Sequence, residues 1–187
     1  VTIDSMNPHI KRLEYAVRGP IVARALQIQD ELNKGAQKPF GEVIRCNIGD
    51  CHATGQKPLT YLRQVIAAVV CPELLESSSF PADVKDRAQK ILNACGGKSV
   101  GAYSNSCGIQ LIREDVAAYI SQRDGLPSVA DDIFLSTGAS DAIKMVLHLI
   151  NSGKEGKERT GVMVPVPMYP LYSATIAEYN EYQISYY

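Results

Sequence analysis

The sequence predicts an α/β fold in which an N-terminal helical arm is followed by the first part of a mostly parallel sheet with flanking helices. Three observations support this fold class. Apolar residues recur at helical spacing through much of residues 8–124, short apolar runs lie at 133–135, 162–164 and 182–187, and helical patterns fall between these runs. The alternating β-α-β-α-β order is typical of a parallel sheet with right-handed crossovers.

The composition describes an ordinary globular protein of 187 residues, 45% of them hydrophobic. Its 19 basic and 20 acidic residues nearly cancel, and no basic run occurs, so we expect no nucleic-acid partner. No apolar run approaches the roughly 18 residues that a membrane span needs, so we expect no membrane partner. Because the chain starts on Val1, we expect an upstream segment to have been removed.

The five cysteines are odd in number and form no C-x-x-C pair, and the three histidines are scattered. This pattern favours reduced thiols in an intracellular protein, cytoplasmic or mitochondrial, over a disulfide framework or a structural metal site. We therefore expect no metal.

The arm is predicted to contain two helices and a strand. Pro8 and Pro20 each follow a residue that starts or breaks a helix, and the second helix should end at Gly35. Residues 42–46 read as a short strand. The long loop that follows is rich in turn residues, which is unusual for a simple connection.

Three more helices should follow this loop. Thr60 can cap the first, which should end near Cys71 and carries Leu62, Val65, Ile66 and Val69 on its apolar face. The second should run from about Pro81 to the Gly pair at 96–97, and the third from about residue 109 to Gly125.

The last third should supply the sheet. Strands are predicted at 133–135, 162–164 and 182–187, with helices at 141–150 and 171–179 between them. The first of these helices should turn Ile143, Val146, Leu147 and Ile150 inward. A parallel sheet is covered on both faces and has about five strands, so we expect the chain to be a piece of a larger domain.

The stretch STGASDAI, residues 136–143, lies at the end of a predicted strand and opens a helix. Gly138 allows an unusual backbone angle, Ala139 leaves space, and Ser140 adds a hydroxyl to a helix N-terminus, which together suit a phosphate. The alternative is a plain turn in which Ser140 caps the helix.

Three further residues are candidates. Tyr169, in PVPMYPLY at 165–172, could stack on a planar ligand or simply pack at a helix start. Tyr103, in a Gly- and Ser-rich loop, could meet a ligand or another chain, or cover a local core. Gly49 offers bare backbone to a carboxylate, which alone is a weak signal, and neither His52 nor Cys51 has a partner that indicates catalysis.

These pieces occur in an order that resembles a known family. The sequence contains EYAVRGPI at 14–21, NIGD at 47–50, LRQV at 62–65, GAYS at 101–104, GIQLIREDVAAYI at 108–120, STGASDAI, and PVPMYPLYSA at 165–174. Together they resemble the N-terminal portion of the fold-type I, pyridoxal-phosphate-dependent aminotransferases, and most of all the branch that acts on alanine. EYAVRGPI and PLYSA are specific to this branch.

The resemblance implies a cofactor site for pyridoxal 5'-phosphate. The backbone N–H groups of Ala139 and Ser140 would hold the phosphate at the turn made by Gly138. Tyr169 would stack on the pyridine ring. Tyr103 would reach the phosphate of the neighbouring subunit, which implies a homodimer, and Gly49 would lie where the N-terminal loop closes over the substrate carboxylate.

The same resemblance implies transfer of an amino group between L-alanine and 2-oxoglutarate, with an amino acid and a 2-oxo acid as small-molecule partners. The family's Schiff-base lysine comes after Tyr187, so we expect no catalytic residue here and no activity from this chain alone; Lys144 should be a solvated helix residue. Residues 1–58 would form the arm and a small-domain segment, and 59–187 the first part of the large cofactor-binding domain.

Two alternatives remain open. One is a sister activity such as glutamate–glyoxylate transamination. The other is a non-catalytic shortened chain that binds and regulates a full-length partner, an idea that the exposed edge of an incomplete sheet supports.

Overall fold

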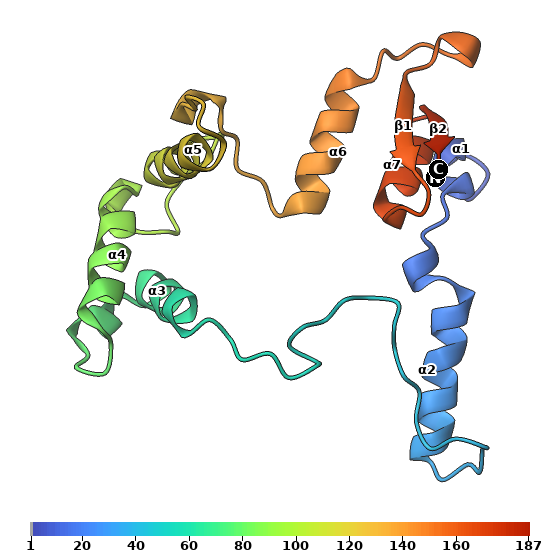
Figure 1. Ribbon diagram of the computed structural model, residues 1–187, viewed down its shortest axis with the longest axis horizontal. Helices are drawn as coiled ribbons and strands as arrows, with labels where there is room; N and C mark the ends of the chain where they lie inside the picture. The colour runs from blue at the N-terminus through green and yellow to red at the C-terminus, as the bar shows by residue number, and fades with distance from the viewer. Residues whose placement is uncertain (1) are drawn as a thin grey trace. The chain divides into compact units, whose positions relative to one another are not determined.

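The structure is a computed structural model that describes residues 2–187 (Figure 1). Its α-helices and strands are α1 (Pro8–Arg12), α2 (Pro20–Asn33), α3 (Thr60–Val70), α4 (Ala82–Asn93), α5 (Gln110–Asp124), α6 (Ala139–Ile150), β1 (Gly161–Pro165), α7 (Pro170–Glu178) and β2 (Tyr182–Tyr186). Short 3-10 helices are η1 (Ala16–Arg18), η2 (Pro72–Glu76), η3 (Gly96–Lys98), η4 (Ala130–Asp132) and η5 (Gly156–Glu158).

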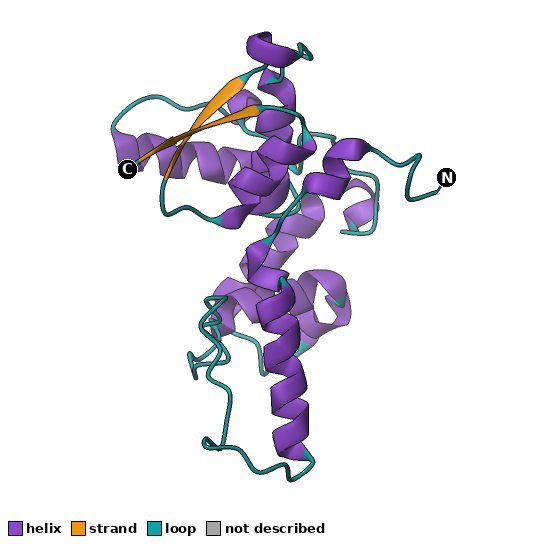
Figure 2. Ribbon diagram, turned by 90° about the vertical axis from the view of Figure 1, so that its right-hand side faces the viewer, coloured by secondary structure: helices purple, strands orange, loops and turns teal. Residues whose placement is uncertain are grey.

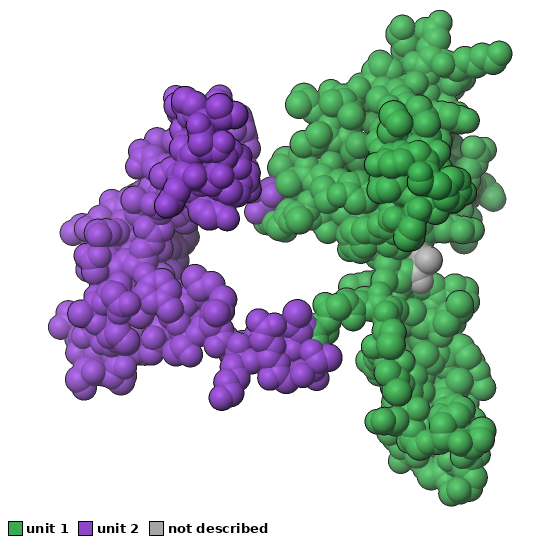
Figure 3. All heavy atoms as spheres, viewed as in Figure 1, with its two compact units in different colours: residues 1–50, 137–187 green, residues 51–136 purple. Residues whose placement is uncertain are grey.

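The chain divides into two compact units, which Figure 3 colours separately. One unit, here called unit 1, joins the described residues up to Asp50 with Thr137–Tyr187, and unit 2 holds Cys51–Ser136. Segments far apart in sequence therefore share unit 1. The predicted domain boundary at residue 58 refers to the domains of the whole protein, and it stays a prediction.

Unit 1 is built on a parallel pair of strands, coloured orange in Figure 2. β1 and β2 pair from Gly161 opposite Tyr182 to Pro165 opposite Tyr186, and α7 makes the connection between them. A parallel pair cannot be joined by a tight turn, so the crossover helix is required. This confirms the predicted β-α-β order for the C-terminal part of the chain.

The apolar core of unit 1 lies between these strands and the helices α6 and α7. Val164 of β1, Leu147 of α6, and Ala174 and Ile176 of α7 are all buried. α6 packs against α7, and α7 against β2. Burying such side chains is the main favourable term in folding, at roughly 25 cal/mol for each Å² of apolar surface removed from water.

The arm contributes two helices to unit 1, as predicted. Pro8 and Pro20 stand in the first turns of α1 and α2, where a missing N–H leaves no hydrogen bond unmade. The Asn7 side chain caps α1 by accepting from the N–H of His9. α1 packs against α7, which ties the start of the chain to the sheet region.

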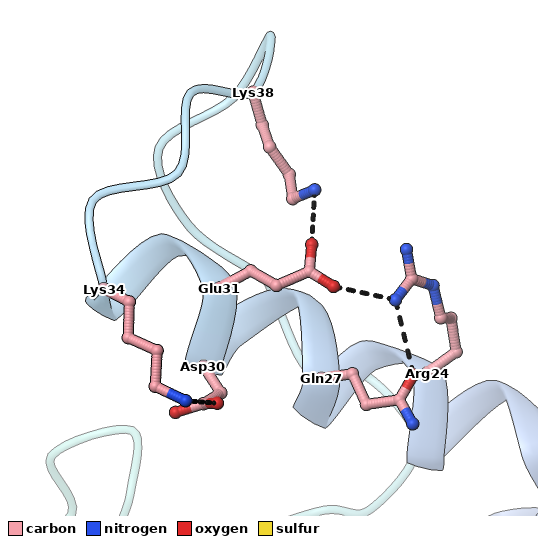
Figure 4. Close-up of polar contacts among 6 residues, drawn as sticks. All are labelled: Arg24, Gln27, Asp30, Glu31, Lys34 and Lys38. Atoms are coloured by element: carbon pink, nitrogen blue, oxygen red, sulfur yellow. Dashed lines mark hydrogen bonds and ion pairs between the residues drawn. The ribbon is translucent and has the colours of Figure 1, made fainter.

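Charged side chains hold the loop after α2 against that helix (Figure 4). Glu31 accepts from Lys38 at 2.6 Å and from Arg24 at 3.0 Å, and Lys34 pairs with Asp30 at 2.6 Å. Hydrogen bonds from Lys38 and then Arg24 lower the pKa of the Glu31 carboxyl. Such exposed pairs contribute little to stability individually, but they define where the loop lies.

Unit 2 is helical. Val65 and Ala68 of α3 are buried where α3 packs against α4, which supplies the buried Val84, Ala88 and Leu92. In α5, Arg113 is 5% exposed and donates to the carbonyls of Gly108 and Ala130, so this buried cation is hydrogen-bonded as burial requires.

Two predicted strands are wrong. Residues 42–46 and 133–135 are extended or irregular but join no ladder among the described residues. Leu135 instead donates its N–H to the carbonyl of Cys107 at 2.9 Å and packs on Gly108, where an added Cβ would meet its side chain at 2.5 Å. An apolar run can supply the side chains of a strand, but a strand also needs a neighbour, which a local pattern cannot specify.

The predicted positions of the helices are confirmed more closely than the predictions of which helix residues are buried. The N-cap of α3 is Leu59 rather than Thr60, which is the first helical residue. Val65 of that helix and Leu147 of α6 are buried as predicted. Four other residues that we expected to point inward are exposed, namely Leu62, Ile66, Val146 and Ile150. None of the helices in residues 2–187 is both long and apolar enough to cross a membrane.

Glu181, just before β2, is a buried polar residue of unit 1 whose carboxylate lacks a partner among the described residues. Its side chain is 5% exposed, and neither carboxylate oxygen has a hydrogen-bond partner among residues 2–187. Burial raises the pKa of this carboxyl, and the charge of His148 opposes the shift. A pKa that is higher in the folded chain than in the unfolded one means that stability falls as pH rises above the unfolded value near 4.5.

We therefore expect Glu181→Gln to stabilise the chain at pH 7 by about 1 kcal/mol, because it removes a buried charge. The gain should disappear below about pH 4.5, where both states hold the proton. Urea unfolding at pH 7 and pH 4 measures this. Glu178→Gln is the matched control: its carboxylate pairs with Lys144 at 2.8 Å, so that variant should gain nothing. A destabilised Glu181→Gln chain at pH 7 would contradict the assignment.

Candidate functional site

The N-terminus of α6 is an open hydrogen-bond donor site. The helix begins at Ala139, after Gly138 with φ 97° and ψ 171°, and no side chain caps it. Within residues 2–187, the backbone N–H groups of Ala139 and Ser140 donate to no other protein group. Both residues are exposed. Unpaired N–H groups and the helix dipole favour an anion at this end, as the sequence predicts.

Gly138 is required by conformation rather than by crowding. Its φ and ψ lie in a region that essentially only glycine populates, while an added Cβ would meet nothing within 4 Å.

Asp141 fixes the turn before α6, a role the sequence analysis did not assign. Its carboxylate accepts from the backbone N–H of Thr137 at 3.2 Å and from the Thr137 hydroxyl at 3.0 Å. An acidic residue in the first turn of a helix that accepts hydrogen bonds from a Thr just before the helix is a recognisable capping pattern. The stretch STGASD therefore contained a signal for this role of Asp141. Asp141 thereby satisfies Thr137 and leaves the first helical N–H groups available.

Tyr169 lies between β1 and α7, where it is the N-cap residue of α7. Its hydroxyl oxygen lies 2.7 Å from that of Tyr15, and the two ring centroids are 6.4 Å apart with an interplanar angle of 73°. Tyr169 keeps 48% of its surface exposed, so much of it remains open to a ligand. Tyr15 belongs to the arm, and sequence reasoning missed it because 154 residues separate the pair.

Gly49 lies in an exposed loop of unit 1, and an added Cβ there would meet nothing within 4 Å. The loop is tied to the arm, because the Asn47 amide donates to the carbonyl of Val17 at 2.9 Å. The motifs EYAVRGPI and NIGD are thus joined by one hydrogen bond, and the first of them also contacts Tyr169.

Tyr103 belongs to unit 2 and is fully exposed in a loop. Its predicted contact with the cofactor phosphate of a neighbouring subunit stays a prediction. The remaining polar candidates are occupied locally: His52 is exposed with Nδ1 3.2 Å from the carbonyl oxygen of Gln56. Lys144 is not simply solvated as predicted, since it pairs with Glu178, whose hydrogen bond raises the lysine pKa.

In the described part of the chain, no group of three or more His, Cys, Asp or Glu side chains could hold a metal ion, and all five cysteines are free thiols. What unit 1 offers instead is a set of N–H groups at the start of α6 without a protein acceptor, and a half-exposed aromatic ring at the start of α7. Such a set can bind and orient an anionic aromatic ligand, but it presents no activated nucleophile.

Comparison with known proteins gives these features a context. Human alanine aminotransferase 1 is 61% identical over 188 residues, which cover all of this chain and 38% of that protein. Over its whole length the chain is similar to alanine aminotransferases. It matches their N-terminal portion and spans well under half the length of the curated relatives it matches. No protein-family model matches the sequence.

Solved structures show the same fold. An aminotransferase from Escherichia coli superimposes with a TM-score of 0.64 at 20% identity, over 97% of this chain and 35% of that chain. Alanine aminotransferase from Pyrococcus furiosus gives 0.63 at 19% identity, over 97% of this chain and 36% of that one. The predicted fold class, a part of an α/β aminotransferase domain, is confirmed.

Gly138→Ala should destabilise the chain by about 1–2 kcal/mol, because alanine tolerates the backbone conformation of Gly138 poorly. The unfolding midpoint in urea measures the change. Gly41→Ala is the control, since Gly41 has no positive φ and also meets nothing within 4 Å. Equal midpoints for the two variants would show that the turn does not hold this conformation.

Proposed function

We propose that this sequence is the N-terminal portion of an enzyme that moves an amino group between L-alanine and 2-oxoglutarate, giving pyruvate and L-glutamate, with pyridoxal 5'-phosphate as cofactor. The observation that carries the proposal is the 61% identity with human alanine aminotransferase 1 over the whole chain. The described residues also suit the cofactor, since α6 offers unpaired N–H groups for its phosphate and Tyr169 offers a ring.

In this proposal the chain binds the cofactor and orients it. The N–H groups of Ala139 and Ser140 bind the phosphate. Because the acceptor is charged, these hydrogen bonds are stronger than those between neutral groups. Asp141 holds Thr137 and so fixes the turn. Tyr169 lies against the pyridine ring and excludes water from that face, an arrangement that contributes roughly 0.5–1.5 kcal/mol beyond area burial.

Pyridoxal phosphate supplies the electron-withdrawing ring system that makes the amino-group transfer possible, which is chemistry the side chains themselves lack. Gly49 would lie where the loop closes over the carboxylate of the amino acid, held there by the bond between Asn47 and Val17. The lysine expected to move the substrate proton lies beyond Tyr187 by family resemblance. Residues 1–187 would therefore bind and orient without catalysing the reaction.

The proposal includes a homodimer. Tyr103 is fully exposed at the surface of unit 2, where its hydroxyl is free to reach a neighbouring subunit, and we assign it the phosphate of the partner's site. Each cofactor would then be held by two chains, and the site would be complete only in the dimer.

The test is an assay of the full-length protein with pyridoxal phosphate, L-alanine and 2-oxoglutarate. We expect pyruvate and L-glutamate to form in equal amounts, and we expect the isolated 187-residue chain to form neither. A full-length protein that turns over glutamate and glyoxylate but not alanine would replace the proposed activity by the sister one. Pyruvate formation by the isolated chain would contradict the placement of the catalytic lysine beyond Tyr187.

A further inference from the structure

The segment EYAVRGPI has no role in the proposed function so far, yet its tyrosine makes the longest-range side-chain hydrogen bond that involves a candidate site residue. Tyr15 and Tyr169 are separated by 154 positions, and their hydroxyl oxygens lie 2.7 Å apart. A side-chain contact between an N-terminal arm and the residue proposed to meet the cofactor ring calls for an explanation in terms of the site.

The contact joins the two rings at their hydroxyl ends. The centroids are 6.4 Å apart and the planes meet at 73°, an edge-to-face arrangement rather than a stack. Tyr169 keeps 48% of its surface exposed, so this contact fixes the ring without covering it. The hydrogen bond to Tyr169 is the largest cause of a raised pKa for the Tyr15 hydroxyl, and either hydroxyl can be the donor.

The backbone that carries Tyr15 is itself held in place. On the N-terminal side, α1 packs against α7, the helix that Tyr169 caps. On the C-terminal side, the Tyr15 carbonyl accepts from the N–H of Arg18 at 3.0 Å, and Asn47 donates to Val17 at 2.9 Å. Tyr15 is therefore anchored on both sides, as a residue must be if it is to fix the position of another.

We infer that Tyr15 is a positioning residue: through its hydroxyl, the N-terminal arm sets the orientation of the Tyr169 ring for stacking on the cofactor. The inference rests on the proposed function, because it assumes that Tyr169 faces pyridoxal phosphate. It adds a specific task for the arm, which is to restrict the ring rotations of Tyr169 before the ligand arrives. A ring that is already oriented loses less conformational entropy on binding.

The test uses the full-length protein and four forms of it: wild type, Tyr15→Phe, Tyr169→Phe and the double variant. The Phe substitutions keep both rings and remove only the hydroxyl groups. The dissociation constant of pyridoxal phosphate is measured by equilibrium dialysis, and the visible circular dichroism of the bound cofactor reports its orientation against neighbouring rings.

We expect Tyr15→Phe to raise the dissociation constant about three- to tenfold, the range that loss of one hydrogen bond gives, and to change the dichroism band. Tyr169→Phe should do the same. In the Tyr169→Phe background, Tyr15→Phe should add nothing, because its hydroxyl then has no partner to hold. A purely structural role for Tyr15 would lower the unfolding midpoint without changing the band.

The outcomes distinguish a failure of the inference about Tyr15 from a failure of the proposed function. If the wild-type protein binds no pyridoxal phosphate, the proposed function fails and the inference fails with it. If wild type binds but Tyr15→Phe leaves affinity and dichroism unchanged, or if its effect persists in the Tyr169→Phe background, only the inference is overturned. Tyr119→Phe, which removes an exposed hydroxyl on α5, is the control and should change neither reading. If Tyr15→Phe fails to fold, Tyr169→Phe alone is used, with the same expected three- to tenfold rise in the dissociation constant. An unchanged dichroism band in Tyr169→Phe then overturns the inference.

Discussion

The parallel pairing of β1 with β2 is the constraint on which unit 1 depends. Parallel strands require a crossover, and here α7 provides it, so the chain must leave β1 at its carboxyl end and turn directly into a helix. Tyr169 lies at that turn. Ligands of parallel sheets collect at the carboxyl ends of the strands, and the pairing therefore decides where the exposed ring of Tyr169 can act.

The N-terminus of α6 and the N-terminal arm both depend on this β1-α7-β2 unit. α6 packs against α7 and presents an uncapped N-terminus, with Asp141 bonded to Thr137 and with Gly138 in a conformation that other residues avoid. The arm packs on α7 through α1 and meets Tyr169 through Tyr15. In both cases packing against the same helix, α7, brings the feature into the unit.

The sequence was informative where structure is set locally. The helices, the strands β1 and β2, and the turn at Gly138 follow from spacing, proline and glycine placement, and the residues around each end. The strands predicted at 42–46 and 133–135 failed because a strand is defined by its neighbour. The pairs Tyr15–Tyr169 and Asn47–Val17 were beyond reach for the same reason, since nothing in either segment indicates which distant segment it will meet. The family resemblance supplied what spacing alone left open, namely a phosphate for the turn and a planar ring for Tyr169.

The central claim is that backbone N–H groups at the start of α6 hold the phosphate of the cofactor. Ala139→Pro tests it most directly, because proline is tolerated at the first helical position and removes only one N–H. The measurement is the ratio of affinities of the full-length protein for pyridoxal phosphate and for pyridoxal, with Ala139→Gly as the control that keeps the N–H. The account predicts that Ala139→Pro weakens pyridoxal phosphate by about tenfold or more and leaves pyridoxal unchanged, since a hydrogen bond to a charged group contributes about 1.5–3 kcal/mol. An unchanged ratio would contradict it.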